Sequence, residues 1–292
     1  RSLGTLGDVV ALDFDSTDFH ADFSKPAQLA DTVRALKPDV IVNSAAHTAV
    51  DKAESEPEFA AKLNADGPRV LATEAKAIGA LLVHYSTDYV FDGSGSAARA
   101  EDAPTGPLSV YGRTKLDGEN HIRASGCAHL ILRTSWVYAA RGGNFARTMI
   151  KLASEREALS VIDDQFGAPT GAELLADVTA HAVRACKAKP ALGGTYHAVA
   201  AGETNWFEYA RFVIEWARAN GLPVKVAADA IRAVPATQTL TVSAVFHLTE
   251  VGRKASLLAG GDGKGVQRLA VQVPATRLHL VSVDLQGNAR LK

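Results

Sequence analysis

The sequence contains few of the residues that mark secreted or metal-binding proteins. Only two of its 292 residues are cysteines, Cys127 and Cys186, and their spacing fits no metal site. Two isolated cysteines suit a reducing compartment, so we expect a cytoplasmic protein. No uninterrupted apolar run approaches the length of a membrane span, and no secretory signal pattern opens the sequence. We therefore expect no membrane partner.

An excess of charge of one sign is also lacking. The sequence has 31 Lys and Arg against 32 Asp and Glu, which gives a formal net charge of −1. Such a balance offers no bulk attraction for nucleic acid or for an anionic membrane surface. The composition is 47% hydrophobic and 22% charged, which is typical of a globular protein. A chain of this length can form one large domain or two modest ones.

The first half alternates between short apolar runs and helical patterns. The runs are continuous rather than alternating, which favours parallel strands covered on both faces. We predict strands at 9–13, 39–46, 80–91 and 129–138. Helices are predicted between them at 26–37, 64–79 and 109–125. Strand, helix and strand repeated in this way predict an α/β fold with a Rossmann-type, doubly wound parallel sheet.

The second half mixes helices and short strands, which predicts a smaller α/β substrate domain. Helices are expected at 144–157, 171–189 and 204–221, with a strand at 195–200. Thr204 is the expected N-cap of the third helix and Gly221 its C-terminal stop. We therefore assign residues 1–140 to a dinucleotide-binding domain and 141–235 to a substrate-binding part.

The segment "VYGRTKLDGE" (110–119) places Tyr111 and Lys115 four residues apart, on one helix face. An ammonium beside a phenol favours the phenolate, which lowers the pKa of the tyrosine and prepares it for proton transfer. The alternative is a packed aromatic residue and a solvated lysine, and an isolated pair favours that alternative. The preceding strand, however, ends in Ser86, Thr87 and Asp88, at the edge where ligands bind in open α/β sheets. These three residues could also serve only to turn the chain.

A hydroxyl at a strand end followed by Tyr-x-x-x-Lys resembles the short-chain dehydrogenase/reductase superfamily. Five longer segments resemble the dTDP-4-dehydrorhamnose reductase family more closely, and they lie at 42–58, 84–93, 110–119, 132–149 and 161–177. The similarity runs from about residue 1 to about residue 235. It implies NADPH- or NADH-dependent reduction of a dTDP-sugar in dTDP-rhamnose biosynthesis, which supplies cell-surface polysaccharide such as O-antigen.

The resemblance also implies roles for individual residues. Tyr111 would protonate the sugar C4 oxygen as hydride reaches C4, and Lys115 would support it and bind the nicotinamide ribose. Thr87 would hydrogen-bond the reacting oxygen, with Asp88 beside it on the substrate. Trp136 would pack against the sugar nucleotide, although a core tryptophan is an equal alternative. The residues implied in cofactor binding are Asp13, Asp22, Phe23, Ala46, His47 and Thr48.

Two regions depart from the family pattern. The family opens with a strand and a glycine-rich turn that cradles the pyrophosphate, whereas "RSLGTLGD" reads as a helix end in which Gly4 and Gly7 are a stop. We expect the strand that is absent to lie between those at 9–13 and 80–91. We therefore expect the 292-residue chain alone to be poorly soluble or partly unfolded and not to bind NAD(P)H measurably. Residues 236–292 carry no family motif and form an atypical tail.

Some members of the family form homodimers through glutamates around Mg²⁺. Glu173 matches one of those glutamates, but an acidic residue in the first turn of a helix is also favoured by the helix dipole. The expected partners of Glu173 would come from the segments that depart from the family. We therefore predict weak or no magnesium-dependent dimerisation.

Two other functions remain open at this point. A non-catalytic regulatory or binding subunit can share the fold, and NADPH oxidation with a dTDP-4-keto-6-deoxysugar would separate it from a reductase. A nucleotide-sugar epimerase or dehydratase can share the Tyr-x-x-x-Lys pair. Such enzymes keep their nicotinamide through the cycle, so release of oxidised cofactor would discriminate between them and a reductase.

Overall fold

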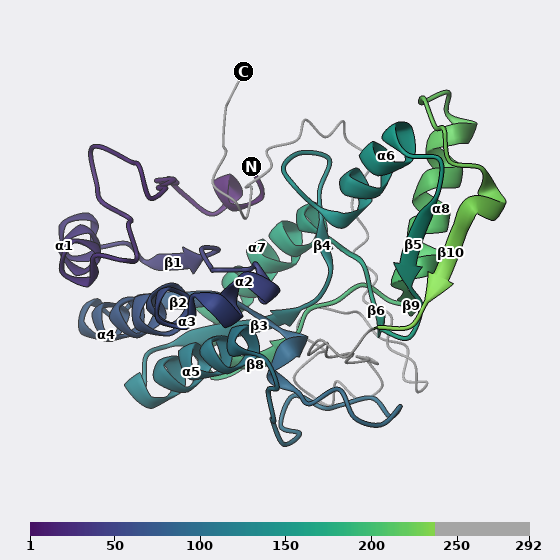
Figure 1. Ribbon diagram of the computed structural model, residues 1–292. Coiled ribbons are helices and arrows are strands. Elements are labelled where there is room, and N and C mark those ends of the chain that lie inside the picture. The colour runs from purple at the N-terminus through teal and green to yellow at the C-terminus, as the bar shows by residue number, and fades with distance from the viewer. Residues whose placement is uncertain (237–292) are drawn as a thin grey trace.

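A four-stranded parallel sheet forms the centre of the computed structural model, which describes residues 1–236. Its strands, in spatial order, are β1 (Val40–Asn43), β2 (Leu81–Thr87), β3 (His129–Thr134) and β8 (Gly194–His197). Each neighbouring pair is parallel. The continuous apolar runs of β2 and β3 are buried because helices cover both faces of the sheet (Figure 1). This arrangement confirms the predicted α/β class.

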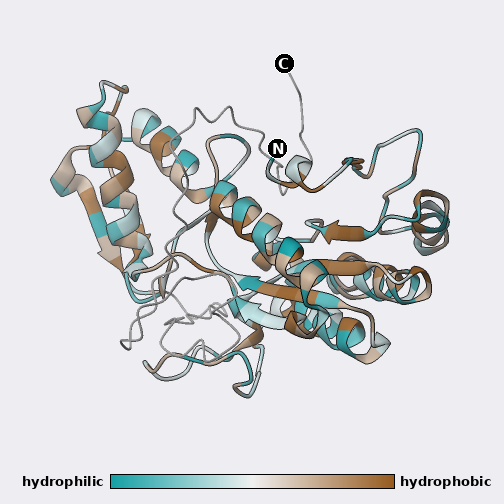
Figure 2. Cartoon of the chain, turned by 180° about the vertical axis from the view of Figure 1, so that it is seen from behind, coloured by the Kyte–Doolittle hydropathy of each residue, from teal (hydrophilic) through white to brown (hydrophobic). Residues whose placement is uncertain are grey.

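Two apolar layers join the helices to the sheet. On one face lie α1 (Pro26–Leu36), α4 (Gly67–Ile78) and α5 (Val110–Ser125). On the other face α7 (Ala172–Ala188) packs through Leu175, Val183 and Cys186. Figure 2 shows α7 crossing the apolar strands from behind. The second predicted helix, at 64–79, is divided into η2 (Lys62–Asp66) and α4.

Short elements connect the strands and helices of this layer. They are η1 (Ser2–Thr5), α2 (Val50–Ser55), α3 (Pro57–Ala61), η3 (Asp88–Val90) and η4 (Pro190–Leu192). Both α2 and α3 pack against α5, and η1 packs against α7. No helix within residues 1–236 is both long and apolar enough to cross a membrane.

A second group of elements forms its own core beside the sheet (Figure 1). It contains α6 (Phe145–Glu155), β5 (Leu159–Ile162), α8 (Trp206–Ala219), η5 (Ala228–Ala230) and β10 (Ile231–Val234). The strands β5 and β10 are parallel, and α6 and α8 pack together. Two short strand pairs complete the structure: β4 (Val137–Tyr138) with β7 (Thr170–Gly171), and β6 (Phe166–Gly167) with β9 (Thr204–Asn205).

The strand predicted at 9–13 is wrong. Those residues have no regular structure, and Val9 and Val10 are 56% and 58% exposed. A strand needs a neighbour to satisfy its backbone groups, and within residues 1–236 none pairs with 9–13. The expected place of an absent strand, beside the strand at 80–91, is also wrong because β1 pairs directly with β2.

The N-terminus of α8 corrects a second expectation. Asn205, not Thr204, is the N-cap, and its side chain accepts a hydrogen bond from the Glu208 backbone N–H at 2.7 Å. Thr204 lies one residue before the cap, and both residues form β9. The predicted stop at Gly221 is confirmed, because its φ of +75° continues the chain in the left-handed conformation that ends many helices. The Leu222 N–H then bonds to the Ala217 carbonyl at 3.0 Å.

Candidate active site

The first turn of α5 fixes the position of the Tyr-x-x-x-Lys pair. Ser109 is the N-cap, and its hydroxyl accepts a hydrogen bond from the Gly112 N–H at 3.0 Å. A glycine is required next to Tyr111, because a Cβ at Gly112 would lie 2.2 Å from the Tyr89 carbonyl oxygen. The close approach brings α5 against η3, so Tyr111 and Lys115 both face the end of β2.

Tyr111 lies buried between the chain that leaves β2 and the helices α2 and α3. Its ring packs edge-to-face against Tyr89, with centroids 5.4 Å apart. Burial raises the pKa of Tyr111 to about 12, while a hydrogen bond with Thr87 acts in the opposite direction. The phenol therefore keeps its proton throughout the neutral pH range.

Lys115 is 2% exposed and points at β2. Its Nζ donates to the Tyr85 carbonyl at 2.6 Å and lies 3.3 Å from His84 Nε2. Burial lowers the pKa of Lys115 to about 8, opposed by the charge of Glu119. The expectation that the ammonium lowers the pKa of Tyr111 is therefore wrong. Burial of the phenol outweighs the other influences, and Lys115 directs its donor toward the strand.

Thr87 and Asp88 complete the polar group at the end of β2. The Thr87 hydroxyl donates to Asp88 Oδ1 at 3.0 Å and accepts from the Tyr89 N–H at 3.2 Å. Burial raises the pKa of Asp88 to about 7, although bonds from Thr87 and the backbone oppose the rise. The structure thus brings Thr87, Asp88 and Tyr111 together, with a proton donor and a hydroxyl in contact. Lys115 lies one turn along α5, against the Tyr85 carbonyl.

Ser86 has a different role from its neighbour. Its hydroxyl donates to Glu119 Oε1 at 2.6 Å, and the Glu119 carboxylate also binds Arg133 through two bonds of 2.9 and 2.7 Å. Arg123 adds a third cationic donor at 3.0 Å. Sequence reasoning missed this buried network. Its signal is Arg133 within the apolar run "HLILRT", where a charge needs a partner.

His47 follows β1 and is held beside α5. Its backbone N–H donates to Asn64 Oδ1 at 2.8 Å, and Asn64 Nδ2 donates to both the His47 carbonyl and Thr114 Oγ1. The Nδ1 atom of His47 is buried without a hydrogen-bond partner in the described part of the chain. Ala46 is half-buried and Thr48 exposed beside it. Asn64 is a positioning residue that the sequence did not reveal.

The remaining residues implied in cofactor binding lie before α1. Asp13 accepts a local bond from the Phe14 N–H, and Asp22 accepts from Ser24 and pairs with Lys25. Hydrogen bonds from Ser24 lower the pKa of Asp22. Phe23 packs on the start of α4, where a Cβ at Gly67 would overlap its ring. No hydrogen bond or ring contact found for these three residues joins them to Tyr111.

Trp136 follows β3 with a φ of +46°, which is unusual for a bulky residue. Its ring stacks on Trp206 with centroids 3.5 Å apart, and it covers Gly167, where a Cβ would lie 2.5 Å from the indole. The side chain is half-buried. Trp136 thus joins the sheet to the second group of elements.

Glu173 lies in the first turn of α7, beside the backbone at Gly171. Within residues 1–236, no group of three or more His, Cys, Asp or Glu side chains could hold a metal ion. A metal-ligand role for Glu173 therefore has no support in the described residues, and weak or absent magnesium-dependent dimerisation stays a prediction. Its nearby acid, Asp177, accepts a bond from the Ser2 hydroxyl at 2.6 Å instead.

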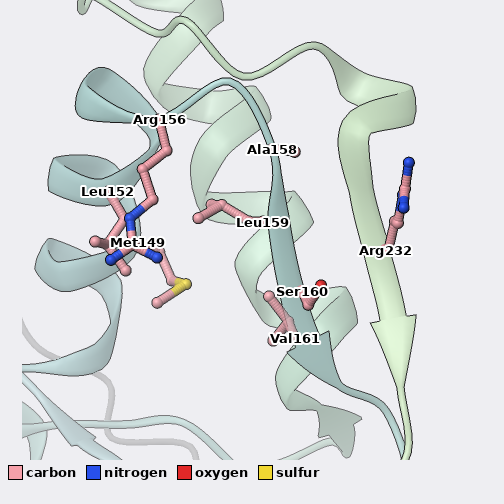
Figure 3. A pocket seen from close by; sticks show the side chains of 8 residues that line it. All are labelled: Met149, Leu152, Arg156, Ala158, Leu159, Ser160, Val161 and Arg232. Carbon is pink, nitrogen blue, oxygen red and sulfur yellow. The ribbon is translucent and has the colours of Figure 1, made fainter.

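A cavity of about 380 Å³ lies away from these residues, between α6 and the strand pair β5–β10 (Figure 3). Its lining residues are Met149, Leu152, Arg156, Ala158, Leu159, Ser160, Val161 and Arg232. None of them is a residue that the sequence analysis placed in the site.

The parallel sheet and the buried Tyr111 and Lys115 at its edge define the class: this is a Rossmann-type protein of the short-chain dehydrogenase/reductase kind. Comparisons with known proteins agree. The family described as "RmlD substrate binding domain" matches residues 3–250. The dTDP-4-dehydrorhamnose reductase of Escherichia coli K12 is 56% identical over 237 residues, which covers 81% of this chain and 79% of that protein.

Two further relatives extend the comparison. The Burkholderia thailandensis dTDP-4-dehydrorhamnose reductase is 45% identical over 253 residues, covering 85% of this chain and 78% of that protein. A solved dTDP-4-dehydrorhamnose reductase from Bacillus anthracis, in complex with NADP, has a TM-score of 0.72 at 31% identity and covers 85% of this chain and 82% of that one. The chain belongs to the dTDP-4-dehydrorhamnose reductase family.

The family match ends at residue 250, beyond the limit near residue 235 that the sequence motifs indicated. Residues 237–292 lie outside the described part of the chain, and so does nearly all of the segment that we assigned to an atypical tail. The division into 1–140 and 141–235 stays a prediction. From the second range, β8 is the fourth strand of the sheet that the first range begins, and α7 packs on that sheet.

Proposed function

We propose that the protein reduces the C4 keto group of dTDP-4-dehydro-L-rhamnose to give dTDP-L-rhamnose, with NADPH or NADH as reductant. The observation that carries the proposal is the contact of Tyr111 with Thr87, one helical turn from a buried Lys115. The family relationship supports the substrate, and the NADP complex of the Bacillus anthracis relative supports the cofactor.

Tyr111 supplies the proton in this proposal. Because its pKa lies near 12, the phenol is protonated at neutral pH and available for transfer. Hydride addition turns the C4 carbonyl oxygen into an alkoxide, which is more basic than a phenolate and takes the proton from Tyr111. Thr87 donates a hydrogen bond to the same oxygen when the substrate displaces its bond to Asp88. Asp88 then lies where it can accept from a sugar hydroxyl, and Trp136 lies at the junction where the sugar nucleotide would pack.

Several residues fit a nicotinamide cofactor. The buried Nδ1 of His47 lacks a partner in the described part of the chain, and a ligand group could satisfy it. Lys115 would bind the nicotinamide ribose, and Ala46 and Thr48 would line the cofactor. Asp13 would bind the hydroxyls of the adenosine ribose. Asp22 and Phe23 would flank the adenine. When bound, the cofactor supplies the hydride; the residues of this chain bind it and hold the proton.

The test is a comparison of the protein with its Tyr111→Phe variant. General acid catalysis contributes about 10²–10⁴-fold, so kcat should fall by that factor while sugar-nucleotide binding is kept. NADPH oxidation with the dTDP-4-keto sugar measures the first quantity and calorimetry the second. Tyr138→Phe is the matched control, because Tyr138 is 40% exposed on β4. Near-normal turnover by Tyr111→Phe would assign the proton to another group.

The same assay separates the alternative functions. A regulatory or binding subunit would bind the sugar nucleotide without oxidising NADPH. An epimerase or dehydratase would convert the sugar without releasing oxidised cofactor. A cytoplasmic location belongs to the proposal, and the two cysteines, both free and buried, are compatible with it. A homodimer is a further part of the proposal that sedimentation can examine.

A further inference from the structure

A chain of hydrogen bonds runs behind Lys115, through residues that the reaction described above does not use. Asn43 lies at the end of β1, and its Nδ2 atom is 3.0 Å from Nδ1 of His84 on β2. The other ring nitrogen of His84, Nε2, lies 3.3 Å from Lys115 Nζ. His84 is 1% exposed, so its ring exchanges no hydrogen bond with bulk water.

The orientation of Asn43 fixes the tautomer of His84. The Ala45 backbone N–H donates to Asn43 Oδ1 at 3.0 Å, so the oxygen of the amide faces Ala45 and the NH₂ group faces His84. An NH₂ group only donates, and therefore Nδ1 of His84 accepts. Burial lowers the pKa of His84 well below its usual value, with the charge of Lys115 acting in the same direction. A neutral ring that accepts at Nδ1 carries its proton on Nε2.

The Nε2–H of His84 consequently points at Lys115 Nζ. An ammonium has three donors and no acceptor, whereas a neutral amine has a lone pair that can accept from Nε2–H. The amine can still donate to the Tyr85 carbonyl. Besides His84, the titratable group that acts on Lys115 is Glu119, whose charge favours the ammonium. Tyr111, one turn earlier on α5, is neutral in the physiological range. Among these neighbours, it is His84 that disfavours the charged lysine, because its Nε2–H group points at an ammonium that cannot accept a hydrogen bond.

We propose that His84, oriented by Asn43, is a positioning residue that controls the protonation of Lys115 and so sets the pH above which the reduction stops. The inference rests on the proposed function, in which Lys115 binds the nicotinamide ribose, and it adds that the charged lysine is the form that does so. Loss of the Lys115 proton then removes activity as the pH rises, which gives the pH profile a basic limb. Because burial lowers the pKa of Lys115 to about 8, we expect this limb near pH 8.

Two variants remove the Nε2–H donor that faces Lys115, each in a different way. In His84→Gln the amide oxygen, which has two lone pairs, can accept from both the Asn43 NH₂ group and the Lys115 ammonium. In Asn43→Asp the carboxylate accepts from Nδ1–H, so the ring moves its proton to Nδ1 and offers a bare Nε2 to Lys115. Both variants should move the basic limb of kcat/KM upward by about one pH unit, which is a tenfold gain above the limb. His181→Gln, at an exposed position of α7, is the matched control and should not move it.

Nitrogen-15 NMR of the unliganded protein tests the tautomer independently of activity. We expect His84 protonated at Nε2 in the parent and at Nδ1 in Asn43→Asp, and a Lys115 side-chain titration that moves upward in His84→Gln. A parent ring protonated at Nδ1, or a titration unmoved in both variants, would overturn the proposal. If no variant or parent reduces the dTDP-sugar, the proposed reaction fails, and the NMR titrations still decide the role of His84.

Discussion

Replacing Glu119 with alanine should destabilise the protein more than almost any other single change. Glu119 is fully buried and accepts four hydrogen bonds, one from Ser86, one from Arg123 and two from Arg133. Arg133 is itself 2% exposed, so the variant leaves a buried guanidinium without its counter-charge. Breaking a buried pair in this way costs about 3–5 kcal/mol. Arg123 is 37% exposed on its side chain, and its bond adds little.

That cost is a large part of the total, because domains are stable by about 5–15 kcal/mol. For a chain of this size, about 2–4 °C of Tm corresponds to 1 kcal/mol, so Glu119→Ala should lower Tm by about 6–20 °C. Urea denaturation at pH 7 measures the free energy directly. The matched control is Glu215→Ala on α8, whose partner Arg211 lies 3.7 Å away at the surface; we expect a change within about 0.5 kcal/mol.

The double variant Glu119→Leu/Arg133→Met examines the cause. If the cost arises from an unpaired buried charge, removing both charges should recover most of the stability lost by Glu119→Ala. A Glu119→Ala variant that loses less than about 1 kcal/mol would show that water or another group replaces the carboxylate. The reasoning from burial would then be refuted.

Three further predictions concern Asp88, Gly112 and Glu173. Because the pKa of Asp88 is raised to about 7 in the folded protein, the folded state holds more protons than the unfolded state between about pH 4 and 7, and stability should fall as pH rises through that window. Asp88→Asn should reduce this decrease of stability with pH, which urea midpoints at pH 5 and pH 8 will measure. An unchanged decrease would assign the pH dependence to other groups. Gly112→Ala should lower both Tm and activity, because its Cβ would meet the Tyr89 carbonyl at 2.2 Å, and normal values would contradict this geometry. Sedimentation with and without a chelator should give the same mass for the parent and for Glu173→Gln; a chelator-sensitive dimer would restore the magnesium site.

The sequence predicted the fold where local pattern and tertiary context agree. Continuous apolar runs gave β2 and β3 because helices bury both faces of the sheet. The run at 9–13 failed, since composition describes one strand while a strand requires a second to pair with it. The N-cap of α8 lies one residue later than predicted because Thr204 and Asn205 are both good caps, and it is the Asn205 side chain that accepts from the Glu208 N–H in the first turn.

The candidate site divides in the same way. The spacing of Tyr111 and Lys115 determined that they share a helix face, because four residues make about one helical turn. The sequence could not determine what that face meets. Crossover connections bring Asn43, His84 and Lys115 from three separate elements to one buried point, and the burial raises the pKa of Tyr111 and lowers that of Lys115. Hydrogen bonding between distant residues and the loss of water around them arise only in the folded chain, so only the tertiary structure decided which groups hold protons at this site.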